Sequence, residues 1–143
     1  MIKDVKMQDF FFSAYKYSCY ALCIIDIAEE IIGRKLDIVD SLLSGIENGY
    51  ICFNFDNYKD EDNFFVRKPH LFLGMLTNKK FDVRMEKANY EPKNNEYMCE
   101  FYSANNGASG HFTRLKQRNF NSLCYSNSVN KGVIISTRVF REV

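Results

Sequence analysis

Three residues of this sequence could together perform nucleophilic catalysis: Cys19, His111 and Asn121. A catalytic cysteine needs a base to take its proton, and a third polar group must hold the imidazole of that base in the correct tautomer. The chain has two histidines, and His111 follows a glycine at the expected start of a strand. Asn121 lies on the expected neighbouring strand. The order and spacing therefore predict a Cys–His–Asn triad that attacks a carbonyl carbon.

The element that would position the nucleophile is a helix over residues 19–32. Its middle holds a single polar residue, Asp26, which predicts a helix buried on most sides. Ser18 suits its N-cap and Gly33 its left-handed end. Cys19 then falls in the first turn, where free N–H groups and the helix dipole favour a thiolate. A buried packing cysteine is equally ordinary at this position, so both interpretations stay open.

The remaining pattern predicts helices first and an antiparallel sheet afterwards. Phe11, Phe12 and Tyr15 are spaced to share one core-facing side of a leading helix. Asp37 is expected to cap another helix. Further elements are expected as a helix from 69 to 76 and strands at 50–55, 81–85, 97–102, 111–115, 119–123 and 133–140. This layout predicts an α+β fold in a single domain over residues 1–143.

Composition excludes several classes of protein. The 143 residues are 46% hydrophobic and 15% aromatic, enough to fill one core, and the formal net charge of +1 argues against nucleic acid as a partner. Five cysteines without a CxxC pair indicate a reduced protein rather than a disulfide scaffold. The start lacks a signal-peptide pattern, and charges interrupt the longest apolar region. We therefore expect a cytoplasmic protein that does not enter a membrane.

Neither a metal nor a cofactor is expected. The acidic loop at residues 56–62 lacks the glycine and terminal glutamate of a calcium loop. Cys19 and Cys23 are one turn apart and could share zinc with a histidine, but Cys23 fits the buried face of its helix. No glycine-rich phosphate loop is present. The other cysteines and histidine are expected to have packing or surface roles: Cys52, Cys99, Cys124 and His70.

Three segments carry a resemblance to a known family: YSCYALCIIDIAE at residues 17–29, GHF at 110–112 and FNSLCYSNSVNKGVIISTRVF at 120–140. They resemble the papain-like cysteine peptidases, closest to the branch that contains the bacteriocin leader peptidases. Within it, the chain is similar to a small phage- and prophage-associated family of unsettled function. The resemblance implies a papain-like fold with Cys19 as nucleophile, His111 as general base and Asn121 as orienting residue.

The sequence departs from the pattern of that branch at three places. Ser18 stands where a glycine is expected, Asn121-Ser122 replaces an Asp-Pro pair, and Gln8 is too far upstream to serve as the oxyanion glutamine. Three interpretations are therefore carried forward. One is a cysteine-dependent hydrolase acting on a peptide or amide bond. The alternative is a catalytically inactive module that binds a protein partner, such as a phage-encoded inhibitor of a host defence system. A purely structural domain is the third.

Overall fold

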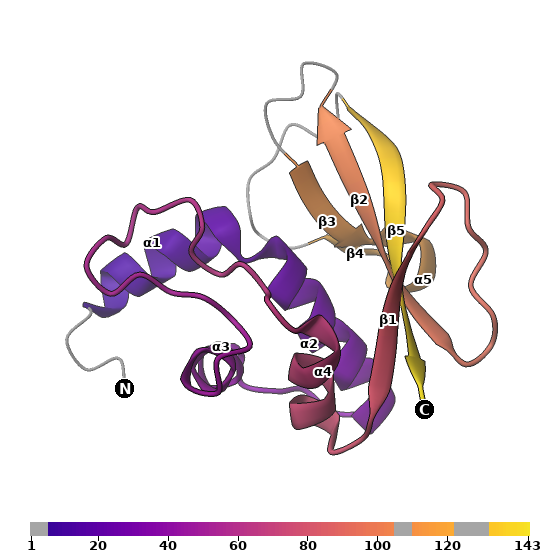
Figure 1. Ribbon diagram of the computed structural model, residues 1–143, viewed down its shortest axis with the longest axis horizontal. Coiled ribbons are helices and arrows are strands. Elements are labelled where there is room, and N and C mark those ends of the chain that lie inside the picture. The colour runs from indigo at the N-terminus through magenta and orange to yellow at the C-terminus, as the bar shows by residue number, and fades with distance from the viewer. Residues whose placement is uncertain (1–5, 105–109, 122–131) are drawn as a thin grey trace.

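The computed structural model describes residues 6–104, 110–121 and 132–143, and it has an α+β fold (Figure 1). The helices of the N-terminal part lie on one side, and the sheet is built from the C-terminal part, as the sequence predicts. The elements in chain order are α1 (Met7–Tyr17), α2 (Cys19–Ile32), α3 (Ile38–Glu47), α4 (Pro69–Thr77), β1 (Phe81–Glu86), β2 (Glu96–Ala104), β3 (Gly110–Arg114), α5 (Leu115–Arg118), β4 (Phe120–Asn121) and β5 (Gly132–Glu142).

The five strands form one antiparallel sheet in the order β1-β5-β2-β3-β4. The last strand of the chain, β5, is inserted between β1 and β2 and pairs with both along most of its length. Strands β3 and β4 form the far edge. This order places the strand that begins Gly110-His111 beside the end of β2, at the same side of the sheet as β4.

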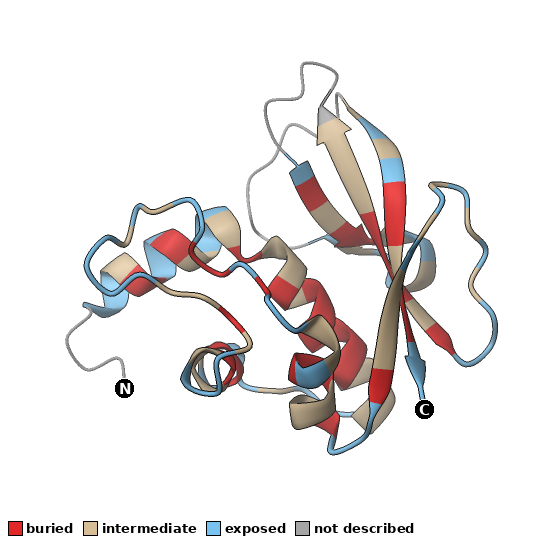
Figure 2. Ribbon diagram, in the orientation of Figure 1, coloured by how far each residue is buried: buried red, intermediate tan, exposed pale blue. Residues whose placement is uncertain are grey.

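Helix α2 lies at the centre of the molecule, and its middle is almost entirely buried (Figure 2). Its apolar side chains meet the other helices on one side and the sheet on the other, in a core that includes Phe10, Leu42, Phe72, Cys99 and Phe140. The helix ends at Gly33, whose φ of 73° places it in the left-handed region and whose N–H donates to Glu29 O. The predicted bounds of this helix are confirmed.

Ser18 occupies the predicted N-cap position of α2, but its side chain does not cap that helix. The hydroxyl instead donates back to the carbonyl of Ala14 in α1. Ser18 is the last, C-capping residue of α1, and its N–H also bonds to Ala14 O. Helix α2 therefore starts directly from the end of α1, and this fully buried junction fixes where Cys19 begins the next helix.

The predicted core face of α1 is wrong. Phe11, Phe12 and Tyr15 are exposed by 50%, 39% and 51%, whereas Phe10 and Ser13 are buried. The Phe10 ring packs against Phe53 and Phe64, with ring centroids 5.7 and 5.4 Å away, in the segment that follows α3. That segment selects the buried face of α1, and its partner residues lie too far along the sequence for local spacing to reveal them.

The strand predicted at residues 50–55 is wrong as well. Only Ile51 forms an isolated antiparallel bridge, with Val66, and the chain then enters turns. The predicted cap Asp37 is confirmed, because its Oδ1 accepts from Asp40 N at 2.9 Å. The predicted strands at 81–85, 97–102, 111–115 and 133–140 correspond to β1, β2, β3 and β5. Residues 122–123 of the strand expected at 119–123, and Cys124, lie outside the described residues.

None of the helices formed by the described residues is long and apolar enough to cross a membrane.

Candidate active site

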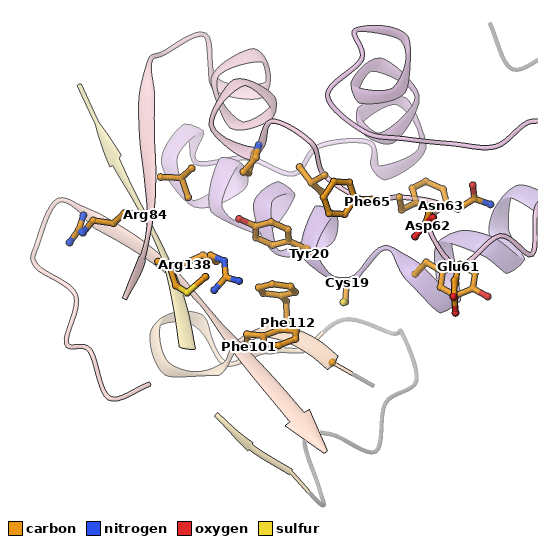
Figure 3. Close-up of a pocket in the computed structure, with 17 residues that line it drawn as sticks. Cys19, Tyr20, Glu61, Asp62, Asn63, Phe65, Arg84, Phe101, Phe112 and Arg138 are labelled. Atoms are coloured by element: carbon orange, nitrogen blue, oxygen red, sulfur yellow. The ribbon is translucent and has the colours of Figure 1, made fainter. Parts of the chain in front are cut away.

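Cys19 is the first residue of α2 and is partly buried. Cys19 lies on the side of α2 that faces the sheet, where Tyr20 stacks on Phe112 and the Cys23 thiol is hydrogen-bonded to the Cys99 thiol. Burial raises the pKa of the Cys23 thiol, and the hydrogen bond to Cys99 adds to this effect. Cys23 is therefore a neutral core residue, as the sequence predicts, while Cys19 opens into a cavity (Figure 3).

His111 and Asn121 are brought together by the hairpin of β3 and β4. Thr113 faces Asn121 in the strand register, so Asn121 is the diagonal neighbour of His111 on the same face of the sheet. The ring Nε2 of His111 lies 2.8 Å from Oδ1 of Asn121. An amide oxygen only accepts hydrogen bonds, so Nε2 carries a proton, and in the neutral ring Nδ1 is the acceptor. A ring nitrogen with a free lone pair is what a general base for a thiol requires.

The two faces of β3 have different roles. Phe112 stacks on Tyr20 of α2, with ring centroids 4.2 Å apart, and Arg114 pairs with Asp26 of the same helix. Because side chains alternate along a strand, His111 points to the opposite face, where the Thr113 hydroxyl donates to Glu100. His111 is buried there with an exposed fraction of 2%. Its neighbours Gly110 and Phe112, rather than His111 itself, line the cavity beside Cys19.

A buried ion pair fixes α2 against β3. Arg114 is fully buried and donates through Nη1 to Asp26 Oδ2 at 2.8 Å, through Nη2 to Gln117 Oε1 at 2.8 Å, and through Nε to Met98 O at 3.1 Å. Its Nη2 also lies 2.9 Å from a carboxylate oxygen of Glu30. These contacts join the helix that begins with Cys19 to the strand that begins with Gly110-His111. They therefore determine how Cys19 is aligned with β3.

β3 pairs with residues 100–103 of β2, and the first residues of β2 are hydrogen-bonded by a side chain of α5 instead of by a longer strand. The Gln117 side chain accepts from Met98 N at 2.6 Å and donates to Glu96 O at 2.9 Å, so it takes the place of a neighbouring strand. Residues 115–118 form this short helix between the strands expected at 111–115 and 119–123, so the first of these strands ends one residue earlier than predicted. The Gln117 bonds hold the β3–β4 hairpin, and with it the His111–Asn121 pair, against the sheet.

On the same face of the sheet as His111 lies a buried carboxyl group, Glu100, which stands opposite Thr113 in the strand register. Its Oε1 accepts from the Thr113 hydroxyl at 3.2 Å and from Lys116 N at 3.1 Å, while Oε2 is buried without a partner among the described residues. Burial raises the pKa of Glu100 above its ordinary value despite these two bonds. The neighbouring Tyr102 also has a raised pKa because of burial and the charge of Glu100. The face of the sheet that holds His111 is therefore lined by buried polar side chains, and its environment disfavours the ionised forms of Glu100 and Tyr102.

The cavity next to Cys19 has a volume of about 680 Å³. Figure 3 shows Cys19 between two ends of different character. One end is formed by the loop that contains Glu61, Asp62 and Phe65. The other end is formed by the rings of Tyr20, Phe101 and Phe112 together with Arg138. A volume of this size suits a ligand of a few residues or a drug-sized molecule.

No further oxyanion donor is supplied by Gln8. It is an exposed residue in the first turn of α1, and the nine positions from Gln8 to the end of that helix at Tyr17 span roughly 14 Å at the helical rise of 1.5 Å per residue. Among the described residues, no group of three or more histidine, cysteine or acidic side chains could hold a metal ion. The groups able to do chemistry in this part of the chain are thus the thiol, the imidazole with its amide partner, and the cavity lining.

Sequence reasoning missed the aromatic and cationic end of the cavity. Tyr20 and Phe112 directly follow Cys19 and His111 in the sequence. An aromatic residue in a helix or strand is ordinarily predicted to be a core residue, so neither was assigned to the site. Arg138 carried a clearer signal. It interrupts the apolar strand VIISTRVF, and a charged residue on the same face as the buried Phe140 needs a partner or a function.

Helices at the N-terminal part, a C-terminal antiparallel sheet and a cysteine-bearing cavity between them define an α+β protein with one candidate active site. The chain matches, over residues 3–142, a family described as a protein of unknown function, DUF261, and it belongs to that family. Neither the comparison with curated proteins nor the comparison with solved structures finds a match.

Proposed function

We propose that this protein is a cysteine-dependent hydrolase of papain-like design that cleaves a peptide or amide bond. The observation that carries the proposal is the 2.8 Å hydrogen bond between His111 Nε2 and Asn121 Oδ1, which makes Nδ1 the proton acceptor of the neutral ring. Two further features support it. Cys19 begins a buried helix, whose N-terminal dipole favours a thiolate, and it lines a cavity large enough for a peptide segment.

In the proposed reaction, His111 Nδ1 takes the proton of the Cys19 thiol, and the sulfur attacks the carbonyl carbon. The C–N bond then breaks, the leaving amine takes the proton from the imidazole, and a thioester forms on Cys19. Water activated by the same imidazole hydrolyses the thioester and restores the thiol. Asn121 holds the tautomer throughout. Because His111 lies on the face of β3 opposite Phe112, the reaction requires that the end of β3 rearrange when substrate binds, so that Nδ1 comes within hydrogen-bond reach of the thiol.

The proposal is tested with p-nitrophenyl acetate, which acylates an activated cysteine without the specificity of a peptide. We expect one equivalent of nitrophenolate per chain in a rapid burst, with the acetyl group mapped to Cys19 by mass spectrometry. Cys19→Ala should lose the burst, and His111→Gln should slow it at least about a hundredfold. Cys52→Ala, which changes another partly buried cysteine, is the matched control and should keep it. An equal burst in Cys19→Ala would overturn the proposal.

A second candidate, a catalytically inactive protein-binding module, is favoured by a separate observation. Alternation along β3 directs His111 away from the face that Phe112 presents to α2 and to the cavity. In that case the cavity would bind a segment of a partner protein, and the His111–Asn121 bond would serve only to stabilise the hairpin. This function predicts that Cys19→Ala retains full affinity for the partner and full biological effect.

A further inference from the structure

Arg138 occupies one end of the cavity and is held over two aromatic rings. The carbon of its guanidinium group lies 5.5 Å from the centroid of Phe112 and 6.0 Å from that of Phe101. Its Nη1 also donates to the Ser136 hydroxyl at 2.9 Å. The half-buried side chain is therefore fixed in one orientation before any ligand arrives.

The positive charge of Arg138 is not neutralised by the described part of the protein. No carboxylate within residues 6–104, 110–121 and 132–143 forms a salt bridge with it. Burial raises the pKa of the nearby Tyr20 phenol, so Tyr20 stays uncharged and supplies no negative charge to Arg138. A guanidinium group in an aromatic cavity retains several N–H donors with the planar geometry that suits a carboxylate.

The other arginine of the cavity provides a contrast. Arg84 donates to Glu86 Oε2 at 2.7 Å and to Glu96 Oε2 at 2.8 Å, so its charge is already matched. Of the two arginines in the lining, Arg138 is therefore the one whose charge lacks a counterpart among the described residues. At the opposite end, Glu61 and Asp62 line the cavity, and Cys19 lies between the two ends (Figure 3).

We infer that the cavity recognises a peptide that carries a carboxylate next to an aromatic or large aliphatic side chain. The carboxylate binds to Arg138, and the apolar side chain packs against Phe112 and Tyr20. The acidic end then favours a positive charge on the preceding part of the peptide, which fixes the direction of the chain across Cys19. Binding of such a peptide is inferred from the cavity alone. That the bound peptide is a substrate rests on the proposed function.

The inference is tested by calorimetric titration of three capped dipeptides at low ionic strength. Acetyl-Ala-Phe with a terminal carboxylate and acetyl-Phe-Asp-amide with a side-chain carboxylate represent the two sources of the anion, and acetyl-Ala-Phe-amide is the neutral control. A hydrogen-bonded charge of this kind is worth roughly ten- to a hundredfold in affinity. We expect at least one of the two acids to bind tighter than the neutral amide by about this factor, and the better acid identifies the source.

Arg138→Gln should abolish the difference between acid and amide. Arg141→Gln, on the same strand but exposed and outside this cavity, is the matched control and should preserve it. Arg138→Lys keeps the charge and should retain part of the preference, which covers the case in which Arg138→Gln does not fold. Equal affinities for all three ligands, or an unchanged preference in Arg138→Gln, would overturn the inference.

Titration of the same ligands into Cys19→Ala separates this inference from the proposed function. A carboxylate preference that persists in Cys19→Ala supports recognition by Arg138 whether or not the thiol is catalytic. Conversely, a burst of acylation at Cys19 without any carboxylate preference would leave the hydrolase proposal in place and refute the assignment of Arg138.

Discussion

The buried ion pair between α2 and β3 gives the most specific stability prediction. Arg114→Met is expected to lower the free energy of unfolding by about 3–5 kcal/mol, the usual cost of removing one partner of a buried pair. The side chain is completely buried, with 2.8 Å to Asp26 and 2.9 Å to Glu30. Methionine fills much of the volume but leaves Asp26 without its closest cation, and Arg118 at 3.6 Å is a weaker substitute. The cost therefore arises from an uncompensated buried charge rather than from a cavity.

The assay is equilibrium unfolding in urea followed by far-UV circular dichroism, with the slope compared between variants. Lys79→Met is the control, because Lys79 and Glu142 form an exposed pair at 3.6 Å that should contribute less than about 1 kcal/mol. Adding Asp26→Asn to Arg114→Met should recover part of the loss, since it removes the stranded carboxylate charge. A loss in Arg114→Met no greater than that in Lys79→Met would refute the reasoning.

Three further predictions concern groups near the sheet. Although burial opposes its ionisation, hydrogen bonds from a backbone N–H, a tyrosine and Arg84 lower the pKa of Glu96 to about 2, so its contribution to stability is present above its ordinary pKa and is lost as the pH falls toward 2. Glu96→Gln should therefore lose less stability than the wild type between about pH 4.5 and 2, measured by urea unfolding. Burial raises the pKa of Glu100, so the wild type loses stability as the pH rises above the ordinary pKa of about 4.5, and Glu100→Gln should gain stability relative to it over that rise in the same assay. A Cβ at Gly110 would overlap the Phe101 ring, so Gly110→Ala should lower the free energy of unfolding by about 1–3 kcal/mol and weaken binding of the carboxylate dipeptides in calorimetry. Unchanged values in any of these comparisons would contradict the corresponding argument.

The parts of the fold that follow from contacts within a few residues were predictable. The left-handed turn at Gly33 and the cap at Asp37 depend on neighbouring backbone groups alone. The failure of the strand predicted at 50–55 could not be foreseen from local sequence. Whether a strand forms depends on its pairing partner, and here the pairing with Val66 is limited to a single bridge at Ile51. Likewise, Ser18 has a chemistry that suits either helix end, and only the direct junction of α1 and α2 decides that its hydroxyl bonds backwards to Ala14.

In the candidate site, too, the features set by local contacts were predictable and those set by distant contacts were not. His111 and Asn121 could be placed together because both lie on a short antiparallel hairpin, where the register is local. The side of β3 to which His111 points depends on which residue α2 contacts, and the sequence does not contain that information. Arg114 and Arg138 were recognisable only as charges in apolar segments. Their partners, Asp26 in one case and two aromatic rings in the other, are mostly distant in sequence.

The most direct test of the central claim is the pH dependence of Cys19 alkylation by iodoacetamide, followed by peptide mapping, in the wild type and in His111→Gln. A working Cys–His pair predicts that Cys19 reacts as a thiolate well below the ordinary cysteine pKa of about 8.5, and that this reactivity is lost or shifted upward in His111→Gln. Circular dichroism confirms that the variant is folded. A Cys19 that titrates normally and identically in both proteins would contradict the account.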